Sequence, residues 1–142
     1  VAYTKDADTA KQVKAADGSI LEGFTPRIVA NGTVPAPTFA SSEITNKGDV
    51  SVTFDLNMAD PAGKHAQFKV TIDSVDNVVT GLETTGTPNK IKLLLTNKMT
   101  SIGLHNVTVT YTKGADAASQ IISTEGGILE SFTQSYTQTI LE

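Results

Sequence analysis

The stretch that decides the fold is residues 50–56, which reads VSVTFDL and alternates apolar with polar side chains. Val50, Val52, Phe54 and Leu56 fall on one side of this stretch, and the two small polar residues and the aspartate between them fall on the other. A β-strand directs successive side chains to opposite faces of its sheet, so a period of two predicts a strand with one buried face.

The same alternation recurs along the chain on both sides of this stretch. Strands are predicted at residues 38–44, 68–72, 78–83, 91–95, 107–111 and 132–140. Clusters of Asn, Asp, Gly and Pro lie between most of them and supply the turns. About seven short antiparallel strands with regular turn spacing predict an all-β fold, an immunoglobulin-like β-sandwich. The likeness to antibody domains is architectural, since the chain has no cysteine and no tryptophan.

Composition agrees with this fold and excludes several functions. Among 142 residues there are 21 threonines and 22 valines plus isoleucines, and such β-branched side chains suit a pleated sheet. The formal net charge of −4 argues against nucleic-acid partners and anionic membranes, which need a basic face. No stretch reaches the roughly 18 apolar residues of a membrane span, so membrane insertion is not expected.

An internal repeat gives the domain organisation. Residues 1–25, VAYTKDADTAKQVKAADGSILEGFT, align with residues 109–133, VTYTKGADAASQIISTEGGILESFT, and 14 of the 25 positions are identical. Residues 1–34 are therefore interpreted as the C-terminal strands of a preceding repeat plus a hinge stiffened by Pro35 and Pro37. Residues 35–142 are predicted to form one complete sandwich, and short helical turns are expected at 8–14 and 115–120. A first residue that is not methionine suggests a piece of a longer chain or a processed product.

Several of these motifs also resemble a known family. They are PTFASSEITNKGDVSVTFDLNMADPAGKHAQFKVTIDSVDNVV at 37–79, NKIKLLL at 89–95, VTVTYTKG at 107–114 and GGILESF at 126–132. Together they resemble the bacterial Ig-like surface repeats of the SwmB type, and the resemblance covers residues 35 to about 140. It implies a spacer or stalk module, in some cases adhesive, within a long extracellular chain, and it carries no catalytic residues.

Candidate catalytic and metal-binding residues are few. His65 and His105 each precede a predicted strand without a second ligand at metal-binding spacing, and no Gly-x-Ser-x-Gly motif occurs, so no enzyme activity is expected. Oxygen-rich turns offer weak calcium candidates, although neither turn follows the DxDxDG pattern. These candidates are Asp55, Asn57 and Asp60 in one turn, and Asp73, Asp76 and Asn77 in the next. No other cofactor is expected.

Glycan binding is a further possibility, because sugar rings stack on exposed aromatic side chains. Most of the aromatic residues of the unit fall on the apolar sides of their strands, which favours the core: Phe39, Phe54, Phe68, Tyr111, Phe132 and Tyr136. The core itself is expected to be led by Val52, Phe54, Phe68, Val70, Leu93, Val109 and Tyr111.

These observations predict a structural spacer repeat of a bacterial cell-surface or secreted protein, located outside the cell. Its partners would be neighbouring repeats or identical subunits. Two alternatives remain open: a subunit of an extracellular filament that assembles by strand exchange, and an adhesive module whose loops bind glycan or a surface protein.

Overall fold

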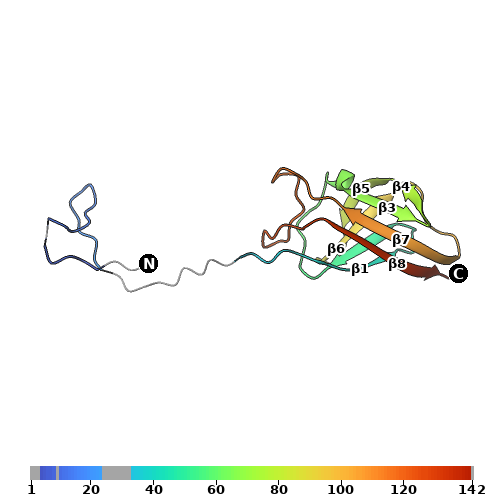
Figure 1. Cartoon of the computed structure of the whole chain (residues 1–142), viewed down its shortest axis with the longest axis horizontal. Helices are drawn as coiled ribbons and strands as arrows, with labels where there is room; N and C mark the ends of the chain where they lie inside the picture. Colours follow the sequence, from blue (N-terminus) through green and yellow to red (C-terminus); the bar gives the residue numbers. More distant parts are fainter. Residues whose placement is uncertain (1–3, 9, 24–32, 142) are drawn as a thin grey trace. The chain divides into compact units, whose positions relative to one another are not determined.

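The computed structural model describes residues 4–8, 10–23 and 33–141, and the chain divides into two compact units, Val1–Thr33 and Val34–Glu142 (Figure 1). The second unit is a sandwich of two four-stranded antiparallel sheets. The first sheet runs in the order β1 (Phe39–Ile44), β2 (Val50–Phe54), β6 (Lys90–Leu95), β5 (Val79–Thr84). The second runs in the order β4 (Val75–Asn77), β3 (Phe68–Ile72), β7 (Gly103–Tyr111), β8 (Phe132–Ile140).

The predicted all-β sandwich is confirmed, with one strand more than expected. Its strand order matches the arrangement of immunoglobulin-type sandwiches, with the short strand β4 added beside β3. The expected helical turns are wrong, because residues 115–120 form bends and turns, as do residues 8 and 10–12, while Lys14 forms a β-bridge with Ile20. Within the described ranges, the helix present is a single 3₁₀ turn, η1 (His65–Gln67), and no helix there is long and apolar enough to cross a membrane.

The core lies between the two sheets and is built from the inward-facing residues of the alternating strands. All seven residues expected to lead it are buried, and Val52, Phe54 and Val70 have no exposed surface. Phe132 joins this core at its edge: its ring centroid lies 5.8 Å from that of Tyr111 and 5.4 Å from that of Phe39. Aromatic rings at such distances stabilise one another beyond the area they bury.

The chain enters the sandwich at one end, and its last strand, β8, ends at the other (Figure 1). At the proximal end, defined here by Phe39 and Phe132, β1 and β8 both begin. At the distal end, Ile140 of β8 pairs with Gly103, the first residue of β7. Because β8 has nine residues and a strand rises about 3.4 Å per residue, the two ends are separated by about 27 Å.

Candidate functional site

The most distinctive local structure lies at the proximal end, in residues 121–129, which we call the terminal hairpin. The amide of Leu129 donates to the carbonyl of Ile121 at 2.9 Å, and the amide of Ser123 donates to the carbonyl of Gly127 at 2.8 Å. Gly126 closes the turn with φ +90°, a conformation that glycine adopts at little cost. The Ser123 hydroxyl also accepts a hydrogen bond from the Gly127 amide at 2.9 Å.

The loop between β2 and η1 holds the terminal hairpin against the sandwich. The Ala59 amide donates to the Ile122 carbonyl at 3.0 Å, and the Thr124 amide donates to the Asn57 carbonyl at 2.9 Å. Ile121 and Leu129 are each only 1% exposed, so the hairpin adds two large side chains to the core.

Two further side chains fix the segment that leads into the terminal hairpin. Lys64 Nζ donates to the Gln120 carbonyl, and Gln67 Nε2 donates to the Ser119 carbonyl, each at 2.6 Å. Both donors come from the region around η1, far from their acceptors in sequence. Residues 119–129 are therefore held against the sandwich both by side-chain hydrogen bonds and by backbone hydrogen bonds.

The first unit contains the same hairpin at residues 13–21, which we call the leading hairpin. Its bonds recur in the second unit at an offset of 108 residues, the distance from Val1 to Val109. Leu21 donates to Val13 at 2.9 Å as Leu129 does to Ile121, and the Lys5–Glu22 ion pair of 2.7 Å recurs as Lys113–Glu130. The other recurring backbone bonds are Ala15 to Ser19, Gly18 to Ala15, and Lys11 to Asp8, matching Ser123 to Gly127, Gly126 to Ser123, and Ser119 to Asp116.

The two hairpins differ in what surrounds them. Leu21 is 44% exposed and Val13 is 51% exposed, whereas their counterparts Leu129 and Ile121 are buried. The leading hairpin thus carries the apolar side chains of a terminal hairpin with their surfaces still accessible.

The open edges of the two sheets are connected by Gln138 of β8. Its side-chain amide donates to the carbonyl of Ile44 at 3.0 Å, and its side-chain oxygen accepts from the Ile44 amide at 2.5 Å. Ile44 is the last residue of β1, and Gln138 lies near the end of β8. One side chain therefore continues the hydrogen bonding of an edge strand across the gap between the sheets, which the alternation in sequence does not reveal.

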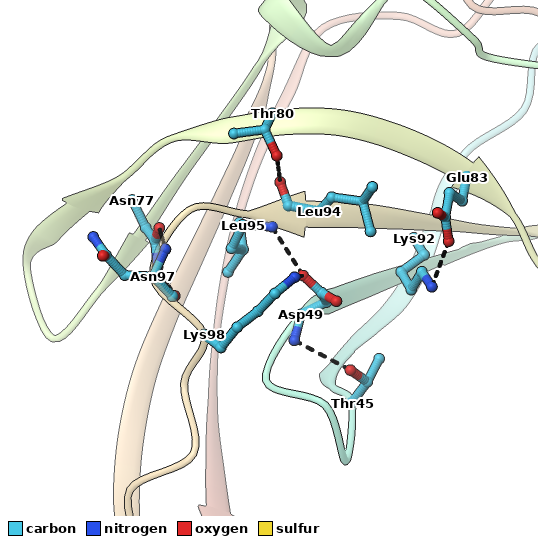
Figure 2. A network of polar contacts seen from close by, with 10 residues as sticks. All are labelled: Thr45, Asp49, Asn77, Thr80, Glu83, Lys92, Leu94, Leu95, Asn97 and Lys98. Carbon is cyan, nitrogen blue, oxygen red and sulfur yellow. Dashed lines mark hydrogen bonds and ion pairs between the residues drawn. The ribbon is translucent and has the colours of Figure 1, made fainter.

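A second polar cluster anchors the turn before β2 (Figure 2). The carboxylate of Asp49 accepts a hydrogen bond from the Leu95 amide at 2.9 Å and contacts the ammonium group of Lys98. Burial raises the pKa of Asp49, but the bonds from Lys98 and Leu95 outweigh it and hold that pKa below its usual value. Nearby, the amide group of Asn77 exchanges two hydrogen bonds with the backbone of Asn97, at 2.6 Å and 3.1 Å.

The structure brings His105 together with Asp73 and Ser101 at the distal end. His105 Nδ1 lies 2.7 Å from Asp73 Oδ2, and Nε2 lies 3.0 Å from the Ser101 carbonyl oxygen and 3.3 Å from its hydroxyl. A carboxylate and a carbonyl only accept hydrogen bonds, so both ring nitrogens are placed to donate, as the imidazolium does. The hydrogen bond to Asp73, followed by the one to Ser101, raises the pKa of His105.

This cluster secures a strained turn. Asp73 and Ser74 join β3 to β4 with φ of 52° and 67°, a left-handed conformation that suits Asn-Gly better than Asp-Ser. The second oxygen of Asp73 accepts from the Asn106 amide at 2.8 Å, and the Asp73 amide donates to the Asn106 carbonyl at 2.8 Å, so β7 holds the turn through His105 and Asn106. A general base needs a ring nitrogen with a free lone pair, whereas both nitrogens of His105 are placed to donate hydrogen bonds, one to Asp73 and one to Ser101. We call these two hydrogen bonds the His105 brace.

The brace makes the stability of the sandwich depend on pH. The raised pKa of His105 means that its stabilisation is complete below about 6.5, the ordinary histidine value, and is lost as pH rises through the folded pKa. The hydrogen bonds from His105 and from the Asn106 amide lower the pKa of Asp73, so its contribution is complete above about 3.8 and is lost as pH falls through the folded pKa. We expect His105→Gln to lower the thermal midpoint at pH 6 and to lower it less at pH 9. His65→Gln is the control, and an equal loss at both pH values would contradict the brace.

The calcium candidates are separated by the fold and have local partners. Asp55 accepts bonds from the amide and hydroxyl of Thr38 at 2.6 Å and 2.7 Å, which hold the pKa of Asp55 below its usual value. Asp60 accepts from the Ala62 amide at 3.0 Å, and Asp76 pairs with Lys69 at 3.0 Å. The side chains of Asp73 and Asn77 are engaged as described above.

Asp55 and Asn57 also line a small cavity of about 190 Å³ beside the turn of the terminal hairpin, which contributes Ser123, Thr124 and Glu125. In the described part of the chain, no group of three or more His, Asp or Glu side chains is placed to hold a metal ion.

Comparison with known proteins gives structural matches only. No family model matches the chain, and no curated protein matches its sequence. Three solved structures of the bacterial S-layer protein SbsC, an N-terminal part, residues 31–844 and domains 1–6, align with 74% of this chain at a TM-score of 0.58 and 16% identity. This chain spans 24% of the first of them and 14% of the other two. At this identity the likeness supports the sandwich fold alone.

Proposed function

We propose that the chain is a structural module of a bacterial cell-surface or secreted protein, in which Ig-like sandwiches follow one another in tandem and act as spacers. The single observation that carries this proposal is the recurrence of the terminal hairpin. The leading hairpin repeats its backbone bonds and its lysine–glutamate pair at a constant offset of 108 residues. The first unit therefore corresponds to the end of a sandwich like the second.

The geometry of the sandwich suits a spacer. Its first strand begins at the proximal end and its last strand ends at the distal end, about 27 Å away, so each copy in an array would span that distance between its two connections. β1 and β8 run from the same end toward the other, and Gln138 bonds to Ile44 between them. A force that pulls the two ends of the sandwich apart therefore loads both Gln138–Ile44 hydrogen bonds at the same time. Two bonds loaded together resist a higher force than one bond would.

The structural neighbours are parts of a bacterial S-layer protein, which supports a location outside the cell. A structural role without catalysis also accords with the His105 cluster, where the polar groups brace a turn. Assembly of separate chains into a filament is the second candidate, and the exposure of Leu21 and Val13 favours it, because a neighbouring molecule could cover them.

The mass of the denatured polypeptide from its native source tests the proposal. A tandem array predicts a mass several times the 14.9 kDa of this chain. A mass near 14.9 kDa would overturn the array and would leave exchange between subunits as the explanation of the duplicated hairpin. Mass spectrometry under denaturing conditions decides between the two without any assumption about the fold.

A further inference from the structure

The leading hairpin differs from the terminal hairpin at a point where the sandwich has no free space. Ser19 occupies the position of Gly127. A Cβ atom on Gly127 would lie well inside van der Waals contact with the carbonyl oxygen of Pro35, in the segment that leads into β1. The two atoms that such a Cβ would approach most closely, the carbonyl oxygen and carbon of Pro35, belong to the backbone, so they cannot yield by a side-chain rotation.

The leading hairpin also closes its turn by different means. The Asp17 carboxylate accepts bonds from the Ser19 amide at 2.9 Å and from the Ser19 hydroxyl, and these hydrogen bonds lower the pKa of Asp17. The terminal hairpin instead uses the hydroxyl of Ser123 to accept from the amide of Gly127, and position 15 of the leading hairpin is alanine. A side chain at position 19 is therefore part of how the leading hairpin is built.

A third difference lies in the sequence that follows. Position 30, which corresponds to Gln138, is alanine, so the segment after the leading hairpin lacks the side chain that joins β8 to β1. If the leading hairpin and the residues after it replaced their counterparts in this sandwich, the two hydrogen bonds of Gln138 would be lost. Ser19 would in addition meet the carbonyl group of Pro35.

From these differences we propose that the leading hairpin docks into a second sandwich of the same fold, whose segment before the first strand leaves room for a side chain at position 19, and that the sandwich described here excludes it. This inference rests on the proposed tandem array and names the partner of its first unit. Neighbouring repeats in an array face each other at high effective concentration, where exchange of matching segments would compete with correct folding. Non-interchangeable hairpins would keep each sandwich paired with its own terminal segment.

A substitution at the point of contact tests the exclusion. We expect Gly127→Ser to lower the thermal midpoint of the full chain by about 5–15 °C, the shift that overpacking of a close contact produces in a domain of this size. Gly86→Ser is the matched control, since a Cβ there meets no atom within 4 Å, and it should leave the midpoint within about 2 °C. Ser19→Gly should leave the midpoint of the sandwich unchanged.

A double-mutant cycle identifies the obstacle. In a Pro35→Gly background the segment before β1 is more flexible and its carbonyl can move aside, so the midpoint loss caused by Gly127→Ser should fall by at least half. Equal losses in the two backgrounds would overturn the assignment to Pro35.

A transplant tests the hairpin as a whole. The full chain carrying the sequence of 13–21 in place of 121–129 should melt well below the parent, and restoring glycine at position 127 alone should recover most of the loss. A transplant as stable as the parent, or no recovery with glycine, would overturn the proposal. Neither result depends on the native mass, so the array and this inference can fail separately.

Discussion

Leu129→Ala is expected to lower the free energy of unfolding of the sandwich by about 3 kcal/mol, near the middle of the range for a buried leucine. Leu129 is 1% exposed and belongs to the same core cluster as Tyr111, whose hydroxyl accepts from the Ile121 amide at 3.4 Å. Alanine would leave a cavity beside groups that are fixed by backbone bonds, so the site cannot collapse to fill it. Urea unfolding followed by fluorescence or circular dichroism measures the loss.

The chain supplies its own control for this experiment. Leu21 occupies the matching position of the leading hairpin but is 44% exposed, so Leu21→Ala should change the unfolding of the sandwich by less than about 0.5 kcal/mol. In a longer chain that contains the preceding repeat, the same substitution should cost as much as Leu129→Ala. Equal effects of the two substitutions in the present chain would contradict the separate environments of the hairpins.

The sandwich itself was predictable because strand alternation is a local signal. A strand with one buried face must place apolar residues two apart, and the stretch around Phe54 and the strand containing Val109 both do so. Burial of these positions follows from the pattern without knowledge of their partners. The 108-residue repeat likewise predicted that residues 1–25 and 109–133 would be chemically alike, although it did not predict the hairpin that both contain.

Features that depend on long-range contacts could not be read in this way. β4 has only three residues, two of them exposed, so it gives no alternation and is recognised only by its pairing with β3. The alanine-rich stretch at 115–120 suggested helix, but its end is held by side chains that lie more than 50 residues away in sequence, since Lys64 donates to the Gln120 carbonyl and Gln67 to the Ser119 carbonyl. Local propensity is a weak prior that such contacts override.

The candidate site was missed for the same reason. Asp73 and His105 are 32 residues apart, and Gln138 lies 94 residues from Ile44, so neither pair forms a motif. The acidic residues singled out as calcium candidates were found because they cluster in sequence. The structure shows that Asp55 and Asp73 each serve a different neighbour, in turns at opposite ends of the sandwich.

Asp49→Ala is expected to lower the free energy of unfolding by about 2–4 kcal/mol, the cost of leaving buried polar groups without their partner. Asp49 is 3% exposed, and it is the hydrogen-bond acceptor for the amide of Leu95 at the end of β6 (Figure 2). The turn that carries it is closed by a bond from the Thr45 amide to the Asp49 carbonyl at 2.7 Å, and it is docked by a bond from the Met99 amide to the Gly48 carbonyl at 2.9 Å. Removing the carboxylate would therefore loosen the connection between the β1–β2 turn and the end of β6.

Two comparisons separate the buried carboxylate from an ordinary ion pair. Asp49→Asn keeps an acceptor for Leu95 but loses the charge, so it should cost less than Asp49→Ala. Glu83→Ala removes the exposed pair with Lys92 in the same sheet and should cost no more than about 1 kcal/mol.

Because the pKa of Asp49 is lowered in the folded state, its contribution is complete above about 3.8 and is lost as pH falls through the folded value. The deficit of Asp49→Ala relative to the parent should therefore persist from pH 5 to 8 and shrink in stronger acid, and a deficit that stays constant into that acid would show that the charge of Asp49 does not contribute.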